Sequence, residues 1–345
     1  MCGSTATKLK CFGSVTGANL GCGAPGAAKA LGGADLRPDF SREVPQNGYA
    51  WWYVDALSDD GQHGLTIIAF IGSVFSPYYF SARRRGEGEP LNHCAINVAL
   101  YGRGGKRWAM TERGRSAVSR DQSRFQVGPS TLQWNGASLT IDFNEIGVPL
   151  PRALRGKVRV HPSALVSEAF PLATGGDHHW QPIAPLSRIE VDIYSNGLKW
   201  SGPGYFDHNR GSGPLEDTFQ YWTWSRSEGA DATTIFYDVK RRTEGPHGLA
   251  LTFDRKGRIE PITPPAKASL ATSLWGIRRE TRSDAGTGAA IIKTYEDTPF
   301  YARSVVSHHV KGVATKSFHE ALSLDRFRSP IVQRMLPFRM PRRAG

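Results

Sequence analysis

The chain has 345 residues, 39% of them hydrophobic and 10% aromatic, which is enough to bury a sizeable core in one large or two ordinary domains. Its formal net charge of +12 favours an anionic partner, either nucleic acid or the face of an anionic membrane. The sequence holds no run of about 18 apolar residues and no apolar h-region near its start, so we expect neither a membrane-spanning helix nor a secretory signal.

The first 40 residues are rich in Gly, Ala and Ser and have no periodicity. This composition is typical of a disordered leader, and the alternative is an overlong gene start. Three of the four cysteines, Cys2, Cys11 and Cys22, lie in this part, and Cys94 lies beyond it. Their spacing matches no paired metal motif, so we expect reduced thiols in a cytosol-like compartment.

Short β-strands are predicted from residue 48 onward. Residues 48–56 are dense in aromatics, and 64–72 form their expected partner across a turn at Asp59, Asp60 and Gly61. Many short strands separated by turns favour an all-β sandwich or barrel, and no window has convincing helical periodicity. The further strands are predicted at 93–101, 107–112, 123–127, 131–134, 138–144, 157–161, 186–194, 218–225, 233–241, 248–254, 274–282, 289–296, 300–310 and 316–324.

An aromatic pattern recurs along the chain. Trp51 and Trp52 are echoed by Tyr221, Trp222 and Trp224, which hints at two similar antiparallel β-domains. The expected parts are a disordered leader, an N-terminal β-domain, a C-terminal β-domain and a basic-apolar tail, at residues 1–40, 41–185, 186–325 and 326–345.

The stretch from Gly202 to Arg226, GPGYFDHNRGSGPLEDTFQYWTWSR, combines an acid, an imidazole, aromatic rings and glycines. Glycine allows turns and a close approach of the backbone, and aromatic rings supply an apolar wall. A carboxyl group at Asp207 inside such a wall would have a raised pKa and act as an acid near neutral pH. The alternative is a Gly-rich turn in which Asp207 closes an Asx-turn before an ordinary strand.

A second polar cluster, GDHHWQP, spans residues 176–182. Adjacent side chains on a strand point to opposite faces, so His178 can share a face with Trp180 while His179 cannot. A metal site would need a third ligand from His208 or from the pair His308 and His309, and the spacing fits no zinc pattern. The alternative is a loop histidine beside a packed tryptophan.

Other standard signals are missing. Residues 102–106, GRGGK, lack the spacing of a phosphate-binding loop, and neither a serine-hydrolase elbow nor a dinucleotide fingerprint occurs. No nucleic-acid module is recognisable. The C-terminal stretch 326–343 alternates Arg with apolar residues, which predicts either a tail packed over the barrel or a patch on a membrane surface.

Four segments together resemble carotenoid 1,2-hydratase of purple bacteria, over residues 40 to 343: WWYVDALSDDGQHGLTIIAFIGSVFSPYY, NHCAINVALYG, the stretch from Gly202 to Arg226, and SFHEALSLDRFRSPIVQRMLPFRMPR. The resemblance implies a lipocalin-like β-barrel fold, shared with tocopherol cyclase. It also implies a hydro-lyase of carotenoid biosynthesis that needs no cofactor. Such an enzyme adds water across the terminal C1–C2 double bond of neurosporene, lycopene and other acyclic carotenoids.

The same resemblance places the family's functional residues at His178, Trp180, Tyr205 and Asp207. From the chemistry we expect Asp207 to protonate the alkene, and the rings of Trp180 and Tyr205 to stabilise the resulting cation. His178 would orient Asp207 or take a proton from water. The substrate-binding residues expected beside them are Trp222, Trp224, Tyr221 and His208.

We expect neither a metal nor nucleic acid to take part, and the sequence implies no protein partner. A water-insoluble substrate and a basic chain predict a cytoplasmic protein that binds the inner photosynthetic membrane peripherally. The competing hypothesis is a non-catalytic, lipocalin-type carrier of a hydrophobic isoprenoid, which would need the aromatic lining but no acid.

Overall fold

The computed structural model describes residues 37–103, 105–229 and 231–343. Nearly all of the expected leader, including Cys2, Cys11 and Cys22, lies outside these residues. Cys94 is buried and carries a free thiol.

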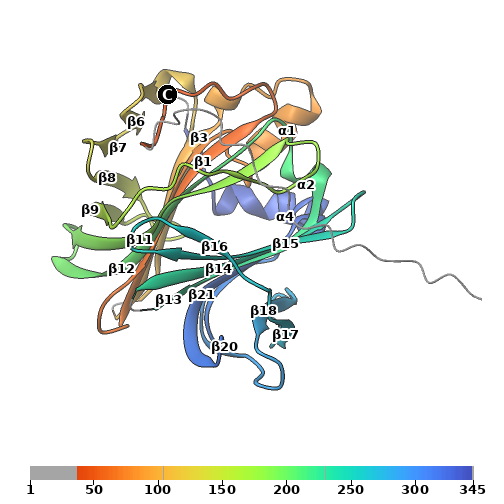
Figure 1. Cartoon of the computed structure of the whole chain (residues 1–345). Coiled ribbons are helices and arrows are strands. Elements are labelled where there is room, and N and C mark those ends of the chain that lie inside the picture. The colour runs from red at the N-terminus through yellow and green to blue at the C-terminus, as the bar shows by residue number, and fades with distance from the viewer. Residues whose placement is uncertain (1–36, 104, 230, 344–345) are drawn as a thin grey trace, which may run out of the picture. The chain divides into compact units, whose positions relative to one another are not determined.

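The first sheet has thirteen strands, of which twelve lie between Tyr49 and Gly211 and one, β22, lies near the C-terminal end of the described chain (Figure 1). Its strands follow the order β22-β4-β3-β2-β1-β12-β11-β9-β8-β7-β6-β5, with β10 paired to β11. All of these pairings are antiparallel except that of β22 with β4. The strands are β1 (Tyr49–Leu57), β2 (His63–Ile71), β3 (Cys94–Gly102), β4 (Arg107–Arg113), β5 (Val118–Arg120), β6 (Arg124–Val127), β7 (Ser130–Trp134), β8 (Leu139–Ile146), β9 (Ala153–Pro162), β10 (Phe170–Pro171), β11 (His178–Ile193), β12 (Leu198–Gly211) and β22 (Arg342–Arg343).

The second sheet has seven strands in the order β16-β15-β14-β13-β21-β20-β19, and a third sheet pairs β17 with β18. These strands are β13 (Phe219–Glu228), β14 (Ala232–Arg241), β15 (Pro246–Asp254), β16 (Ile259–Pro261), β17 (Ala266–Leu270), β18 (Arg279–Ser283), β19 (Ala290–Asp297), β20 (Tyr301–Val310) and β21 (Val313–Ser323). The helices are short: α1 (Pro77–Arg84), α2 (Leu215–Thr218), α3 (Leu324–Phe327) and α4 (Pro330–Met335), with 3-10 turns η1 (Pro90–Asn92), η2 (Arg115–Ala117) and η3 (Leu336–Phe338). The all-β prediction is confirmed.

Side-chain alternation along β1 divides the interior into two cores. Trp52 and Val54 face a core built from strands of the first sheet, the segments that join them and the segment before β1. The first sheet therefore curls around its own apolar side chains. Trp51 and Tyr53 face the opposite way, into a core shared with the second sheet. The chain passes from the first sheet to the second between Gly211 and Phe219. The division into domains expected at residue 185 stays a prediction.

Three of the four glycines of the central stretch, Gly202, Gly204 and Gly211, lie in a strand and not in a turn, and Gly213 lies in the bend that follows. Residues 198–211 form β12, between β1 and β11. A Cβ at Gly202 would lie 1.9 Å from the carbonyl oxygen of Leu57, and one at Gly204 would lie 2.2 Å from Cδ1 of Ile189. These glycines therefore allow close approach of neighbouring strands. The strand predicted at 274–282 is also shorter than expected, because β18 begins at Arg279.

This packing predicts that Gly202→Ala is destabilising, because the new methyl group would clash with backbone that cannot rotate away. We expect a loss of about 1–3 kcal/mol in the free energy of unfolding, measured by urea denaturation. Gly213→Ala is the matched control, since a Cβ there meets nothing within 4 Å. Equal stability of the two variants would contradict the packing of β12 against β1.

Candidate active site

The carboxyl group of Asp207 is the centre of a hydrogen-bonded cluster between the two sheets. Its Oδ2 accepts hydrogen bonds from Nε1 of Trp180 at 2.9 Å and from the hydroxyl of Tyr205 at 2.8 Å. Trp180 Nε1 also lies 3.0 Å from the Tyr205 hydroxyl oxygen, and Nδ2 of Asn209 lies 3.4 Å from the second carboxyl oxygen, Oδ1. Two donors thus converge on Oδ2, whereas Oδ1 accepts one longer hydrogen bond, from Asn209.

Strand geometry explains why these residues meet. Tyr205, Asp207 and Asn209 alternate along β12 and point to the same face, and Trp180 pairs with Asn209 across β11 and β12. Trp180 and Tyr205 are fully buried in the core between the sheets. The structure therefore brings together three of the four residues expected to be catalytic.

Asp207 differs from the other buried acids because it has no cationic partner. Among the residues that the structure describes, the remaining buried carboxyl groups each form an ion pair with Arg or Lys: Asp55, Glu112, Glu145, Glu216, Asp238 and Glu296. Asp207 is 4% exposed and is held by uncharged donors alone. Burial of this kind penalises the charged form of a carboxyl group.

The pKa of Asp207 is accordingly raised well above its ordinary value. Burial is the largest cause, and the carboxylates of Glu320 and Asp55 add to it, whereas the hydrogen bonds from Tyr205 and Trp180 lower the pKa. Burial likewise raises the pKa of the Tyr205 hydroxyl well above its usual range, with the carboxyl of Asp207 contributing. A protonated Asp207 is the chemical state that a general acid requires.

His178 lies beside this cluster and is held by hydrogen bonds of its own. Its Nδ1 lies 3.1 Å from the Tyr49 hydroxyl and its Nε2 lies 2.8 Å from Oγ1 of Thr218, so both ring nitrogens are engaged. Burial lowers its pKa to about 4, which keeps the ring neutral near pH 7. Within the described residues it forms no hydrogen bond with Asp207, so any effect of His178 on that carboxyl is indirect.

The four residues expected to bind substrate divide into two groups. Trp222 and Trp224 lie in the core between the sheets, and the rings of Trp224 and Tyr205 are 5.2 Å apart. Tyr221 points to the other face of β13, and His208 points to the other face of β12, where its ring stacks on Trp52. The structure does not bring Tyr221 or His208 together with Asp207, because the alternation of side chains along a strand puts them on opposite faces.

A cavity of about 280 Å³ opens from the surface toward this cluster. Its inner wall includes the rings of Trp51, Tyr53 and Trp222. Asp207 does not line the cavity: the ring of Tyr53 lies 6.1 Å from that of Tyr205, so one layer of aromatic rings separates the space from the carboxyl group.

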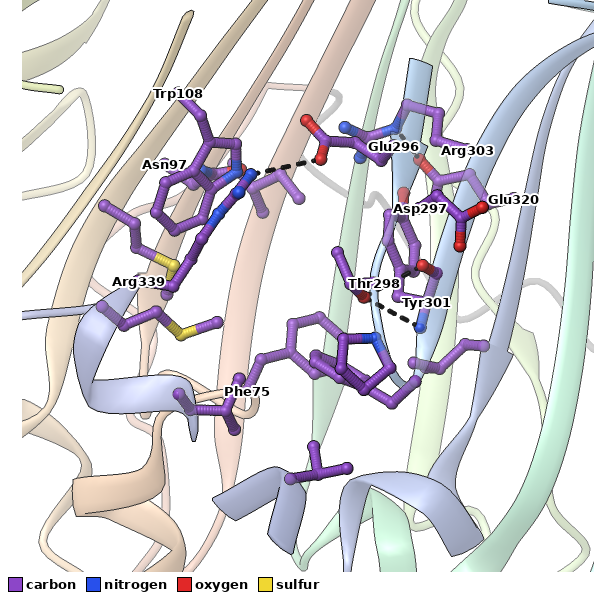
Figure 2. Close-up of a pocket in the computed structure, with 18 of the residues that line it drawn as sticks. Phe75, Asn97, Trp108, Glu296, Asp297, Thr298, Tyr301, Arg303, Glu320 and Arg339 are labelled. Carbon is purple, nitrogen blue, oxygen red and sulfur yellow. Dashed lines mark hydrogen bonds and ion pairs between the residues drawn. The ribbon is translucent and has the colours of Figure 1, made fainter. Parts of the chain in front are cut away.

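The cavity has a charged side that sequence reasoning missed (Figure 2). Glu320 accepts hydrogen bonds from the Tyr53 hydroxyl at 2.8 Å and from Nε of Arg303 at 2.9 Å. Toward the other end, Arg339 pairs with Glu296 at 3.3 Å and lies over the ring of Trp108. The available signal was weak, because Arg303 and Glu320 are charged residues within the predicted strands 300–310 and 316–324, and those strands also contain other polar side chains.

The remaining sequence-based questions concern a metal site and a membrane-spanning helix. No group of three His, Cys, Asp or Glu side chains is placed to hold a metal ion within the part of the chain that the structure describes. The imidazole of His308 contacts Ser227 and Ser317 in the second sheet. No helix among the described residues is long and apolar enough to cross a bilayer.

Comparisons with known proteins identify the family. The family model for carotenoid hydratase CrtC matches residues 67–345. The acyclic carotenoid 1,2-hydratase of Thiocapsa roseopersicina is 53% identical over 94% of this chain and 79% of its own, and that of Rubrivivax gelatinosus is 49% identical over 89% and 76%. This chain belongs to the carotenoid hydratase family.

Solved structures also share the fold of this carotenoid hydratase family member. Kievitone hydratase from Nectria haematococca superimposes with a TM-score of 0.52 at 10% identity, covering 83% of this chain and 93% of its own. At that identity the likeness shows the lipocalin-like fold alone. The lipocalin-like expectation is confirmed.

The raised pKa of Asp207 predicts how stability depends on pH. Above about pH 4, the unfolded chain ionises this carboxyl group while the folded chain keeps it protonated, so its contribution to stability falls as pH rises toward the folded pKa. The Asp207→Asn variant has no ionisable group at this position, so it lacks this fall in stability with rising pH. Urea denaturation over a pH series should therefore show the variant gaining stability relative to wild type as pH increases, and parallel curves would contradict a protonated Asp207.

Proposed function

We propose that this protein adds water to the terminal C1–C2 double bond of acyclic carotenoids such as neurosporene and lycopene, giving tertiary alcohols. The observation that carries the proposal is the buried carboxyl group of Asp207, which lacks a cationic partner and accepts hydrogen bonds from Trp180 and Tyr205. An isolated alkene offers no carbonyl to polarise and no leaving group, so only a strong acid held against it can start the reaction. The names of the relatives supply the substrate class.

In the proposed reaction, the Asp207 proton goes to C2 and the electron pair of the double bond forms the new C–H bond. The tertiary cation at C1 is then attacked by water. The oxygen of that water forms the C–O bond, and its surplus proton returns to the Asp207 carboxylate, which restores the acid. No electron is gained or lost, so the chemistry requires no redox cofactor.

Trp180 and Tyr205 contribute to this step through their hydrogen bonds. Both donate to Oδ2, so they stabilise the carboxylate that forms when the proton leaves Oδ1. This role adds to the stabilisation of the cation by their rings, which is worth about 2 kcal/mol or more per desolvated contact. We assign His178 the role of a positioning residue, because its ring packs between those of Tyr49 and Phe219 beside the cluster.

Substrate access requires movement of the aromatic layer. The cavity ends at Tyr53 and Trp222, and the carboxyl group lies behind Tyr205. We propose that one of these rings rotates when the carotenoid end group enters, so that the alkene reaches Oδ1. We also propose that the protein works at the cytoplasmic face of a membrane, where its water-insoluble substrate resides.

The central experiment replaces the acid. Asp207→Asn keeps the shape and the two accepted hydrogen bonds but removes the acidic proton. General acid catalysis typically contributes about 10²–10⁴-fold, and hydration of lycopene in detergent should fall by at least the upper part of that range. Circular dichroism should show that the variant folds.

Two further variants sharpen this test. Trp180→Phe removes one donor to Oδ2 but leaves an aromatic ring, so part of the activity should remain. Glu320→Gln tests whether Glu320 is the proton donor instead of Asp207. Glu320 is the alternative because its carboxyl group lines the cavity and is hydrogen-bonded to Tyr53. If Asp207→Asn hydrates lycopene within about tenfold of wild type while Glu320→Gln is inactive, the acid is Glu320. A wild-type protein that binds lycopene without product would be a carrier.

The proposed mechanism also predicts that no metal is needed, because a carboxylic acid supplies the proton directly. Activity should be unchanged after exhaustive dialysis against a chelator and without any added nucleotide. A loss of activity that zinc restores would contradict this mechanism and point to the histidines instead.

A further inference from the structure

Exposed apolar side chains are concentrated around the mouth of the cavity. Ten large hydrophobic side chains are exposed among the described residues, and five of them form what we call the apolar rim. Trp275 and Met335 line the cavity themselves, and each of the others is next in sequence to a residue that does. The apolar rim consists of Leu274, Trp275, Ile331, Met335 and Phe338.

The C-terminal segment is apolar on two sides. Val332, Leu336 and Met340 point inward and are buried. Ile331, Met335 and Phe338 have the spacing i, i+4 and i+7 and point outward, with Ile331 70% and Phe338 83% exposed. This segment therefore has one apolar face buried against the protein and a second apolar face exposed to solvent. An exposed apolar face of this kind indicates a surface that binds another apolar partner.

The loop between β17 and β18 presents its apolar residues in a fixed way. The backbone N–H groups of Leu274 and Trp275 donate to the carboxylate of Asp297, at 2.6 and 3.3 Å, and Asp297 lies in the cavity wall. The side chain of Leu274 is nevertheless 98% exposed. A Cβ at Gly276 would lie 3.2 Å from Nη1 of Arg326, so this loop adjoins the C-terminal segment. The two parts of the rim are therefore neighbours.

The charges beside the rim are complementary to an anionic surface. Arg334 is exposed between Ile331 and Phe338, and neither Arg334 nor Arg326 forms an ion pair within the part of the chain that the structure describes. The exposed acid in this segment, Asp325, is paired with Arg242. The chain as a whole carries a formal net charge of +12. Basic residues beside exposed apolar anchors are typical of segments that lie in a membrane interface.

The size of the cavity fits this arrangement. Its 280 Å³ is slightly below the range of about 300–1,000 Å³ found for pockets that enclose drug-sized ligands. An acyclic carotenoid is much larger than such a ligand, so the cavity can hold its end group and not its whole chain. The remainder of the polyene must stay outside the mouth, in surroundings that are themselves apolar.

We infer that the apolar rim docks on an anionic lipid bilayer, so that the carotenoid enters the cavity end first while the rest of its chain stays in the lipid. The inference rests on the proposed function for the identity of the substrate. The docking itself does not depend on catalysis, and it can be measured without carotenoid.

The experiment is flotation of the full-length protein with vesicles of phosphatidylcholine, with or without phosphatidylglycerol. Wild type should bind the anionic vesicles, and salt should weaken the binding. The double variant Leu274→Ser, Phe338→Ser should bind roughly a hundredfold more weakly, because each side chain lost from the lipid weakens binding by about tenfold. Arg334→Gln should weaken binding to the anionic vesicles by roughly fivefold.

Val313→Ser is the matched control, since Val313 is 64% exposed but lies at the far end of β21 from Glu320 and Leu322, which line the cavity. It should bind vesicles like wild type. Equal binding by wild type and the double variant would overturn the inference. So would a wild-type dimer, seen by sedimentation, that the double variant converts to monomer, because the rim would then contact a second copy.

Activity in detergent separates this inference from the proposed function. With lycopene presented in detergent micelles the double variant should hydrate it at the wild-type rate, whereas with lycopene in anionic vesicles its rate should fall with the loss of binding. Vesicle binding without hydration by the wild type would refute the proposed function alone. Loss of detergent activity in a folded double variant would show that the rim acts in catalysis and would overturn its assignment as a docking surface.

Discussion

The structure depends on one buried carboxyl group that is not neutralised by a cation. Asp207 is enclosed by two β-sheets and held by an indole N–H and a phenol hydroxyl. A carboxylate is costly in such surroundings, whereas a neutral carboxylic acid is not. The fold thus places this carboxyl group where the protonated form is favoured. Each of the other buried acids in the described residues lies beside an Arg or Lys side chain, so Asp207 differs from them in its partners and not in burial alone.

Buried polar contacts also have a structural role, because an ion pair and two hydrogen bonds join the two sheets. Asp55 on β1 pairs with Arg226 on β13 at 2.5 Å, and Tyr53 on β1 donates to Glu320 on β21. Tyr101 on β3 accepts a hydrogen bond from Arg303 on β20 at 2.6 Å. Removing one partner of a buried pair leaves an unpaired group, which is strongly unfavourable, so these contacts fix how the sheets face each other. That orientation in turn sets the width of the cavity and the position of the aromatic layer before Asp207.

The apolar cavity, its exposed mouth and the buried acid form a sequence of environments suited to a long hydrocarbon. The mouth is apolar and flanked by arginines, the cavity admits an end group, and the acid lies behind a layer of rings. A layer of aromatic rings thereby separates the cavity from Asp207. This arrangement of mouth, cavity and carboxyl group also accounts for the leucine and phenylalanine exposed beside the cavity. Such positions are ordinarily polar on the surface of a soluble protein.

Sequence alone determined the all-β class and many of the strands, because these follow from local residue patterns and turn signals. It did not predict β12, the strand that carries Tyr205 and Asp207, because the glycines of that stretch suggested turns. Tyr205 and Asp207 were selected together through family resemblance, which also linked Trp180 to Asp207. Only the tertiary structure decided that Gly202 and Gly204 serve close strand packing, that Tyr221 and His208 face away, and that Glu320 and Arg303 reach the cavity from strands more than 90 residues beyond Asp207. These facts depend on which strands become neighbours and on how the sheets curl. Such long-range contacts have no signature in the local pattern of residues.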